Sequence, residues 1–409
     1  MGLETTIDEG LRVIRRIGSS ELEYVRQVLA SEFRSSSGAT FMRRLEQAFA
    51  NRFGSAYAVS FVNGTATMHA ALEAMGIGEG DEVIVPPLTM SATTFAVLQA
   101  NATPIFADVD ESTFQISAAS IEERITPRTR AIITVALYGL SPDMDPIMSL
   151  AGKHGLKVIE DNAECFLGRY KGRMVGTIGH CSSFSFQSSK HLTSGEGGMI
   201  LTDDADLAEG IRKVQSLGYA GVGATKARIT KRDIQDPGYS RHVSMGWNYR
   251  MPELCCAVAL AQVENIDALV ERRMAVARIF TEATREMHEW FTPQHVGSEY
   301  VNSFWTWVCR NRHASATWHE IRDAFLAEGG DGVYAAWKLT YLEPMFIHRN
   351  LLRRERYISP SNLESYRLGL CPIAERLQPQ LFQFKTNYWD LAQAYRQADI
   401  LRRVLLRFN

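Results

Sequence analysis

The sequence has no excess of charge of either sign and no long apolar run. Its 44 Lys and Arg residues against 46 Asp and Glu give a formal net charge of −2, so nothing favours a nucleic acid or an anionic membrane as a partner. No apolar stretch approaches the length of a membrane span, and the N-terminal MGLETTIDEG has neither the basic start nor the apolar centre of a secretion signal. We therefore expect a cytoplasmic protein whose substrates are small molecules.

Cysteine is also scarce, with six in 409 residues. None of them stands in a CxxC pair, and no histidine is spaced with them as in a zinc site. The sequence therefore gives no basis for a bound metal. The six residues expected to be buried free thiols in a reducing compartment are Cys165, Cys181, Cys255, Cys256, Cys309 and Cys371.

The segment CSSFSFQSSKHLTSGEGGMI, residues 181–200, is the most informative stretch of the chain. Ser183 and Ser185 alternate with phenylalanines, which predicts a half-buried strand. Lys190 follows the strand and precedes Gly195-Glu196-Gly197-Gly198, a turn able to take backbone angles that are closed to other residues. A partly desolvated lysine amine there could attack a carbonyl as a neutral nucleophile and form a Schiff base. A solvated surface lysine is the alternative.

A second candidate site lies at the start of a predicted helix. A short strand at residues 57–62 runs into Asn63-Gly64-Thr65-Ala66-Thr67 and an alanine-rich helix that reaches Met75. Asn63 is a suitable N-cap, and Gly64 lets a ligand approach the first free backbone N–H groups. These groups, together with the Thr65 hydroxyl, form a phosphate site. A plain capped helix explains the same segment equally well.

Apolar strands alternate with helices in the next part of the chain. This order predicts an α/β fold with a mostly parallel sheet that is covered on both faces. Ligands of such sheets collect at the carboxyl ends of the strands, and Asp161 stands at such an end after Val158-Ile159-Glu160. Asp161 could equally cap the next turn. The strands are expected at residues 83–85, 104–106, 131–135 and 157–159.

One cofactor accounts for these three parts together. Pyridoxal phosphate needs a lysine for its Schiff base, a carboxylate that keeps its pyridine nitrogen protonated, and donors for its phosphate. Lys190, Asp161 and the helix start after Asn63 would supply them in one sheet. The combination is more informative than any of the parts alone.

Several motifs, in their order along the chain, resemble those of the DegT/DnrJ/EryC1/StrS family of pyridoxal-phosphate-dependent sugar and cyclitol aminotransferases. They cover residues 20–270 in detail and the remainder more loosely. The motifs are Asn63-Gly64-Thr65-Ala66, Gly78-Glu79-Gly80-Asp81-Glu82-Val83-Ile84-Val85-Pro86, Val158-Ile159-Glu160-Asp161, Ser183-Phe184-Ser185-Phe186, Lys190, Gly195-Glu196-Gly197-Gly198 and Gly246-Trp247-Asn248-Tyr249-Arg250.

The resemblance implies an α/β fold of the aspartate-aminotransferase type, which is fold type I of the enzymes that use this cofactor. Such a fold has a large domain, built on a mostly parallel seven-stranded sheet, and a smaller C-terminal α+β domain. We assign residues 16–265 to the large domain and residues 266–409 to the small one, with residues 1–15 as a candidate addition to the latter.

The resemblance also implies roles for individual residues. Lys190 would bind the cofactor and move protons between the two half-reactions, and Asp161 would pair with the pyridinium. The residues implied at the phosphate are Gly64, Thr65, Ala66 and Ser185.

Two further positions are implied at the cofactor but are unusual. Glu164 stands where the family often has Gln, near the phenolic oxygen, and an acid there would repel a phenolate unless a proton is shared. Met90 stands where the family usually stacks an aromatic ring on the pyridine, and it offers only softer sulfur and methyl contact. The alternatives are an ordinary surface or cap carboxylate for Glu164 and a core methionine for Met90.

The stretch 218–245 is rich in glycine and basic residues and has little periodicity, so we expect a long loop. It precedes Asn248, which the resemblance places at the phosphate of a neighbouring subunit in a homodimer with shared active sites. A solvated loop is the alternative to a loop that lines the neighbour's site. The basic residues that could meet an anionic substrate there are Lys226, Arg228, Lys231 and Arg232.

Helices and a strand are predicted in the parts of the chain outside the sheet. Two helices between residues 20 and 53 flank a serine-rich turn at 34–38, and Pro252 should start one long helix from Leu254 to about Phe280. A strand at 304–308 and helices at 316–328 and 388–407 should follow. His191 and His348 are expected to be structural. The aromatic residues that border an acceptor site, or pack in the core, are Tyr334, Trp337, Tyr341 and Phe346.

The resemblance predicts a transamination in two stages. Glutamate or glutamine would donate an amino group, which a ketone of a nucleotide-linked keto-sugar or a cyclitol would accept, and Lys190 would move the protons in both stages. Relatives that deoxygenate sugars generally replace this lysine by histidine, so Lys190 favours amination. The alternatives are a dehydratase or aminobenzoate-type synthase of the same family, and a regulatory protein that keeps the fold without the chemistry.

Overall fold

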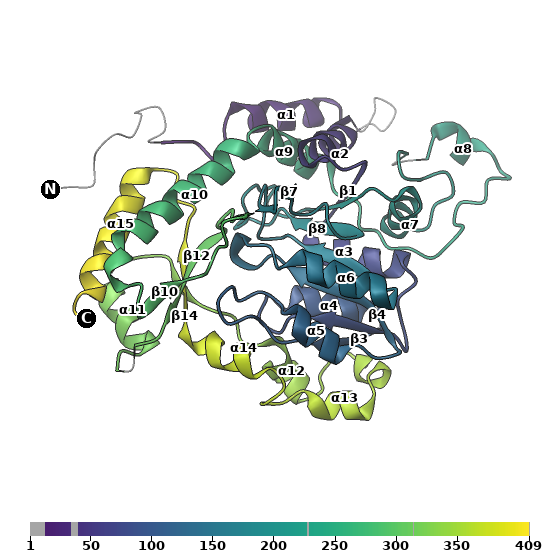
Figure 1. Ribbon diagram of the computed structural model, residues 1–409. Helices are drawn as coiled ribbons and strands as arrows, with labels where there is room; N and C mark the ends of the chain where they lie inside the picture. Colours follow the sequence, from purple (N-terminus) through teal and green to yellow (C-terminus); the bar gives the residue numbers. More distant parts are fainter. Residues whose placement is uncertain (1–12, 34–39, 227–228, 314, 409) are drawn as a thin grey trace.

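The computed structural model describes residues 13–33, 40–226, 229–313 and 315–408, and its centre is a seven-stranded sheet (Figure 1). Within this sheet β9 alone runs antiparallel to its neighbours, so the predicted mostly parallel sheet is confirmed. The strands, in spatial order, are β1 (Tyr57–Phe61), β9 (Gly198–Thr202), β8 (Cys181–Ser185), β5 (Lys157–Asp161), β4 (Thr129–Val135), β2 (Glu82–Val85) and β3 (Thr103–Phe106).

Helices cover both faces of this sheet. Val83 and Val85 pack into one core with α3 and α4, while Ile84 between them packs into another with α5 and α6. Successive side chains of a strand point to opposite faces, so an uninterrupted apolar strand must be covered on both. These helices and the next one are α3 (Gly64–Ala74), α4 (Ala92–Gln99), α5 (Ala118–Arg124), α6 (Met144–His154) and α7 (Ala205–Gln215).

A third core joins the sheet to helices from distant parts of the sequence. Phe49 and Phe53 pack against Phe184 of β8, with ring centroids 5.1 and 4.8 Å apart. The helices that meet there are α1 (Ser19–Ala30), α2 (Thr40–Phe53) and α9 (Glu253–Glu264).

The single long helix predicted after Pro252 is wrong in one respect, because the structure has two helices. The break lies at Asn265, whose backbone leaves helical angles and which separates α9 from α10 (Ile266–Ala283). Asn competes for backbone hydrogen bonds and favours helix ends. Val263 and Ile266 are buried on either side of the break, so the apolar pattern runs through it without a signal.

The second half of the chain forms an antiparallel four-stranded sheet packed against helices, which confirms the predicted α+β part (Figure 1). The predicted strand at 304–308 begins two residues later and extends further, and both predicted helices are present but shorter. The elements are β10 (Phe291–Pro293), β12 (Thr306–Asn311), β13 (Val333–Ala335), β14 (Leu381–Lys385), α11 (Trp318–Ala327) and α15 (Leu391–Leu405).

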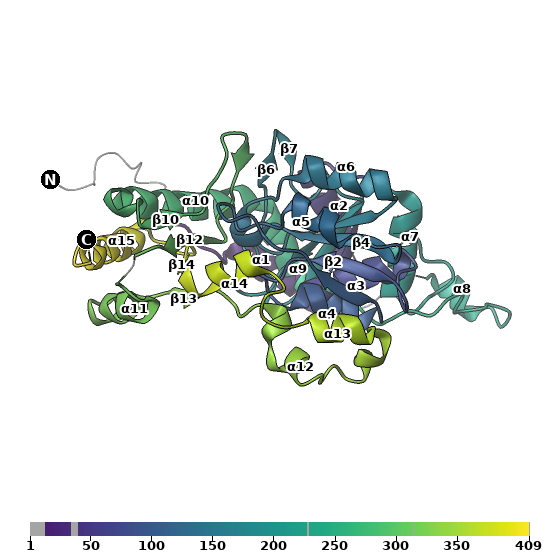
Figure 2. The same cartoon turned by 60° about the horizontal axis from the view of Figure 1, so that its bottom comes forward.

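Part of this second half returns to the large sheet. Tyr341, Phe346 and Tyr366 surround Phe106 of β3, with ring centroids 5.2 to 5.9 Å away. In Figure 2 the helices of this segment lie along one side of the large sheet, near α4. A division of the chain at residue 265 stays a prediction. The helices are α12 (Pro344–Ile347), α13 (Pro360–Ser365) and α14 (Pro372–Leu377), and a small third sheet holds β6 (Arg169–Tyr170), β7 (Arg173–Met174) and β11 (Tyr300–Val301).

The predicted loop at 218–245 projects from the body of the molecule as an arm that carries one short helix, α8 (Lys231–Gln235) (Figure 2). Thr230 caps this helix and Asp233 reaches back to it, a capping box visible in the sequence TKRD. The serine-rich turn at 34–38 and Arg228 lie outside the described residues. No helix in the described ranges is both long and apolar enough to cross a membrane. All six cysteines are free, and Cys255 alone among them is not fully buried.

Candidate active site

The residues singled out in the sequence gather at one edge of the large sheet. Asp161 ends β5, and Ser185 ends the neighbouring parallel strand β8. β1 ends nearby and leads through Asn63 into α3. In parallel sheets the carboxyl ends of the strands form the ligand-binding edge, and this arrangement brings the candidate residues to it.

Lys190 lies just beyond the end of β8 and is nearly buried, with 9% of the residue exposed. Its Nζ is 3.5 Å from Oε1 of Glu164 and lies 4.4 Å from the centre of the Trp305 ring. The alternative of a solvated surface lysine is therefore wrong. An amine buried between a carboxyl and an indole is well placed to react with a ligand at the sheet edge.

Three side chains from distant segments hold the backbone beneath this lysine. The carbonyl groups of residues 188–190 accept hydrogen bonds from Arg16, Arg273 and the Trp305 indole, at distances of 2.7 to 3.0 Å. Burial lowers the pKa of both guanidinium groups, and the Arg16 charge adds to this effect at Arg273. Residues 188–190, the lysine loop, are thus fixed by Arg16, by Arg273 of α10 and by Trp305, which immediately precedes β12.

Asp161 is buried, and both of its carboxyl oxygens are engaged. Oδ2 accepts a hydrogen bond from the Thr93 hydroxyl at 2.8 Å, and Oδ1 accepts one from the Ala163 amide at 3.1 Å. Burial raises the pKa of Asp161, while these two donors and the Lys190 charge oppose the rise. The bond from the Ala163 amide is the one that the capping alternative requires. The bond from Thr93 of α4 goes beyond capping, because it comes from a different element and fixes the other oxygen.

Glu164 is the second buried carboxyl at this edge. Its Oε2 accepts the Tyr138 amide at 3.0 Å, and Oε1 faces Lys190. Burial raises the pKa of Glu164, and the charge of Asp161 adds to the rise, whereas Lys190 and the Tyr138 amide oppose it. The alternative of a surface carboxylate is therefore wrong, whereas the bond from the Tyr138 amide is of the kind that a cap makes. A raised pKa favours the protonated form, which is the form compatible with a nearby anion.

The start of α3 approaches β8 more closely than a larger residue would allow. A Cβ on Gly64 would come within 3.0 Å of Cβ of Ser185, and a Cβ on Gly198 within 2.7 Å of the Asn63 backbone. Asn63 is the N-cap, as predicted, and its Oδ1 accepts the Ala66 amide at 2.8 Å. The amides of Gly64 and Thr65 and the Ser185 hydroxyl therefore remain as candidate anion donors.

The prediction that β8 is half-buried is wrong, since all five of its residues are buried. The phenylalanine face packs into the core with α2, as expected, but the serine face is covered as well. Ser183 lies 2.5 Å from the Thr67 hydroxyl of α3, hydroxyl to hydroxyl. Small hydroxyl side chains allow the start of α3 to pack directly on β8. The serine face of β8 is therefore polar but buried, which its alternation with phenylalanine does not reveal.

Met90 and Asn248 are the predicted cofactor residues that are most exposed to solvent. Met90 stands three residues before Thr93, and 51% of it is exposed, so it is not a core methionine. Asn248 is exposed and pairs through its backbone with Ser216 at the base of the arm. The contacts of their side chains with a cofactor stay predictions.

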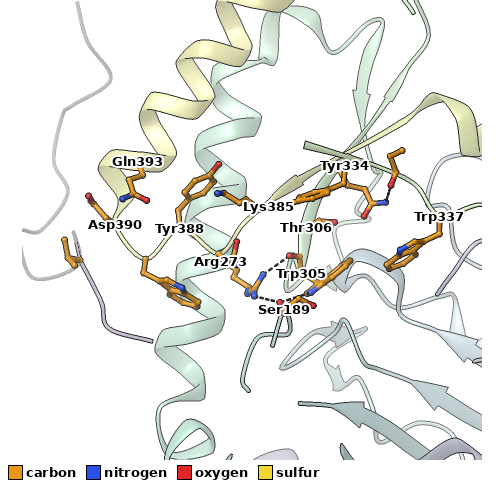
Figure 3. Close-up of a pocket in the computed structure, with 15 residues that line it drawn as sticks. Ser189, Arg273, Trp305, Thr306, Tyr334, Trp337, Lys385, Tyr388, Asp390 and Gln393 are labelled. Atoms are coloured by element: carbon orange, nitrogen blue, oxygen red, sulfur yellow. Dashed lines mark hydrogen bonds between the residues drawn. The ribbon is translucent and has the colours of Figure 1, made fainter. Parts of the chain in front are cut away.

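A cavity of about 900 Å³ lies beside Ser189 of the lysine loop and is lined mainly by residues in and around β12, β13 and β14 of the four-stranded sheet (Figure 3). Tyr334 and Trp337 line it together with Trp305, and the Trp305 and Trp337 rings stack with centroids 5.8 Å apart. Tyr341 and Phe346 instead pack in the core. Core packing is confirmed for Tyr341 and Phe346, and a border to an acceptor site stays a prediction for Tyr334 and Trp337. The cavity is within the size range of small-molecule sites.

Both histidines are placed without a ligand role. His191 is fully buried next to the reactive lysine, and its ring lies 2.9 Å from the Ser303 carbonyl through Nε2. Burial, and then the Arg273 charge, lower its pKa well below the usual value. His348 is exposed at the end of α12.

Four residues that complete this site carry no local signal in the sequence. Thr93 orients Asp161, while Arg16, Arg273 and Trp305 hold the lysine loop. Thr93 lies 68 positions from Asp161, and the other three lie more than 80 positions from Lys190.

The residues present fit pyridoxal phosphate. A buried amine, a buried carboxyl with oriented oxygens and a helix start at a glycine cradle occupy one sheet edge. They are the donor and acceptor groups that this cofactor requires.

Comparison with known proteins agrees with this geometry. The profile of the DegT/DnrJ/EryC1/StrS aminotransferase family matches residues 15–359. GDP-perosamine synthase of Escherichia coli O157:H7 is 42% identical over 260 residues, which are 64% of this chain and 67% of that protein. GDP-perosamine synthase of Caulobacter vibrioides is 39% identical over 296 residues, or 72% and 75%.

A solved structure is similar over almost the whole length. The aminotransferase from Psychrobacter cryohalolentis superposes with a TM-score of 0.85 at 28% identity, covering 96% of this chain and 98% of that one. The fold of the aspartate-aminotransferase type is thereby confirmed, and so is the predicted transaminase. The chain belongs to the DegT/DnrJ/EryC1/StrS aminotransferase family.

Proposed function

We propose that this aminotransferase uses pyridoxal phosphate to move an amino group from glutamate or glutamine to the ketone of a nucleotide-linked keto-sugar, in the synthesis of an amino sugar. The observation that carries the proposal is the buried Lys190 beside Glu164 and Asp161 at one sheet edge. The two relatives named as GDP-perosamine synthases support the sugar nucleotide as the substrate class. A cyclitol ketone is the alternative acceptor, and we place the reaction in the cytoplasm.

The chain's own groups would hold the cofactor as follows. The amides of Gly64 and Thr65 and the hydroxyls of Thr65 and Ser185 bind the phosphate, next to the Ala66 turn. Asp161, oriented by Thr93, meets the pyridine nitrogen. Met90, which is half exposed, would cover one face of the ring.

Bound pyridoxal phosphate supplies an electron sink for the negative charge that develops on the substrate carbon. The Lys190 amine takes the proton from that carbon in the donor stage and returns a proton in the acceptor stage. Glu164, whose pKa is raised, holds a proton next to this amine, so that Glu164 and Asp161 do not both carry a negative charge. Burial of all three groups keeps water away from the reacting atoms.

The cavity beside Trp305 suits the acceptor. Its rings, contributed by Trp305, Trp337 and Tyr334, can pack on the apolar faces of a sugar ring, and the lysine loop forms one wall. The sugar ketone would then be presented to the sheet edge, with the nucleotide extending toward the open side.

We further propose that the chain works as a homodimer with shared active sites. The arm leaves large apolar side chains exposed, with Met245 at 78% and Val243 at 59%. Contiguous exposed apolar residues mark interaction surfaces, and a second copy would bury them. Asn248 at the base of the arm would then reach the phosphate in the neighbouring subunit, and Lys226, Lys231 and Arg232 would meet its anionic substrate.

The deciding experiment compares Lys190→Ala with the exposed control Lys153→Ala. Loss of a general base costs about 10²–10⁴-fold in rate, and loss of the covalent lysine adds to this, so Lys190→Ala should show no measurable amination while it stays folded. The readout is the visible spectrum of the protein with pyridoxal phosphate, before and after glutamate, glutamine and then a keto-sugar nucleotide. Amination retained in Lys190→Ala would refute the mechanism. A bound cofactor that neither donor changes would favour the dehydratase branch.

A further inference from the structure

The Lys190 amine has a second neighbour that the proposed chemistry does not yet use. Its Nζ lies 4.4 Å from the centre of the Trp305 ring, on the face of the indole. Cations are attracted to the face of an indole, and the attraction is stronger where the cation is shielded from water. Lys190 is almost completely buried, so this condition is met.

The orientation of Trp305 is fixed relative to the lysine. The indole Nε1 donates to the carbonyl of Ser189, the residue before Lys190, at 3.0 Å. Trp337 stacks on the same indole with an interplanar angle of 23° (Figure 3). The ring is thus hydrogen-bonded to the backbone next to the lysine and packed against a second indole.

The amine is held from two directions. Oε1 of Glu164 accepts a hydrogen bond from the amine at 3.5 Å at the edge of the large sheet, and the face of the Trp305 ring lies 4.4 Å away on the side of the four-stranded sheet. A lysine side chain is a flexible stem with a compact charge, and without such contacts the amine would sample many positions. A proton-transfer step needs the amine within hydrogen-bond reach of the reacting carbon.

We propose, resting on the function proposed above, that Trp305 is the positioning residue that keeps the Lys190 amine at the reaction centre whenever that amine is not bonded to the cofactor. Transamination requires such a stage, because the nitrogen of the amino donor replaces that of the lysine. Trp305 immediately precedes β12, so the segment that leads into the four-stranded sheet takes part directly in placing the lysine.

The test uses three variants of the full-length protein. Trp305→Phe keeps a ring face but loses the hydrogen bond to Ser189, and Trp305→Leu loses both. Trp307→Phe is the matched control, since Trp307 is buried two residues away and donates its Nε1 to Thr281 at 2.9 Å. Melting temperatures establish that each variant is folded.

The first measurement is the rate of the half-reaction with glutamate, and with glutamate deuterated at the reacting carbon. Trp305→Leu should lower the rate constant about tenfold and Trp305→Phe about threefold, because a shielded cation–ring contact has an effect of that order. The isotope effect should rise in the same order, since proton transfer becomes limiting. Trp307→Phe should leave both unchanged. A merely structural role for Trp305 would alter cofactor content without raising the isotope effect.

The second measurement does not depend on turnover. Acetic anhydride labelling of the cofactor-free protein, read by peptide mass spectrometry, should modify Lys190 several-fold faster in Trp305→Leu than in the wild type. Lys153, with a side chain 63% exposed, is the internal standard. Equal labelling and equal isotope effects in all variants would overturn the proposal. A wild type that reacts with neither glutamate nor glutamine would instead refute the proposed function, and the labelling rates would still show whether Trp305 shields Lys190. If Trp305→Leu does not fold, the same comparisons are made with Trp305→Phe.

Discussion

Two adjacent threonines on α4 have opposite surroundings. The Thr93 hydroxyl donates to Asp161 at 2.8 Å, whereas the Thr94 hydroxyl is buried without a hydrogen-bond partner among the described residues. Thr93→Val should raise the pKa of Asp161 further and weaken pyridoxal phosphate binding about tenfold, since a hydrogen bond to a charged group contributes about 1.5–3 kcal/mol. The measurement is a titration with the cofactor at constant pH.

Thr94→Val is the control for that substitution. It has the same change in shape and removes a hydroxyl that has nothing to bond to, so cofactor binding should not change and stability should stay equal or increase by up to about 1 kcal/mol. Equal loss of binding in both variants would show that the Thr93 hydroxyl does not act through Asp161.

His191 should make the protein less stable in acid. Its folded pKa is lowered well below 6.5 by burial and by Arg273, so below pH 6.5 the unfolded chain takes up a proton that the folded ring refuses. The contribution is complete above pH 6.5 and is lost as the pH falls, by about 1.4 kcal/mol per pH unit. His191→Gln keeps a donor for the Ser303 carbonyl but does not titrate. The difference in Tm between this variant and the wild type should therefore shift in favour of the variant between pH 7.5 and pH 5.5.

The exposed His348→Gln serves as its control. It makes the same exchange of residue at a solvent-exposed position at the end of α12. A His191→Gln difference that does not vary with pH would contradict the assignment of the acid loss to this residue.

At the scale of elements, the contact between β9 and the start of α3 should be sensitive to a single methyl group. Gly198→Ala would place its Cβ within 2.7 Å of the Asn63 backbone and 2.9 Å of the Gly64 nitrogen. Backbone cannot yield as a side chain can, so α3 would move at the proposed phosphate site, at a cost of about 1–3 kcal/mol. Both Tm and the affinity for pyridoxal phosphate should fall.

Gly152→Ala is the matched substitution in a neighbouring element. Gly152 lies inside α6, where an added Cβ would meet no atom within 4 Å. Alanine is the better helix former, so stability should increase by about 0.5–1 kcal/mol and cofactor binding should not change. If Gly198→Ala bound the cofactor as tightly as Gly152→Ala does, the α3 start would not be the phosphate site.

The elements also show what the sequence can and cannot reveal. Local periodicity predicted six of the seven strands of the large sheet, all but β9, and α3 with its Asn63 cap, because burial and capping are local effects. It missed the break at Asn265, where apolar residues continue on both sides, and it took the serine face of β8 for a solvent face. Contacts such as Trp305 with Lys190 arise only after the chain folds back across 115 residues, and no local pattern records them.

For the whole molecule, the central expectation is that two subunits share each site. Two inactive variants test it: Lys190→Ala removes the reactive amine, and Asn248→Asp places a negative charge at the base of the arm, where the proposed dimer would bring it to the partner's phosphate. If Asn248 acts across the interface, a mixed dimer has one site with both defects and one with neither. Random mixing makes half of the dimers mixed, so about a quarter of the wild-type activity should return.

The same experiment separates this arrangement from a site built within one chain. If Asn248 served its own subunit, each subunit of a mixed dimer would carry one defect, and activity would stay absent however the subunits were combined. Activity restored in proportion to the mixed dimer, measured after purification through a different affinity tag on each variant, would also explain why the single chain leaves Asn248 and the apolar residues of the arm exposed. A monomer in solution that is fully active would contradict the shared site directly.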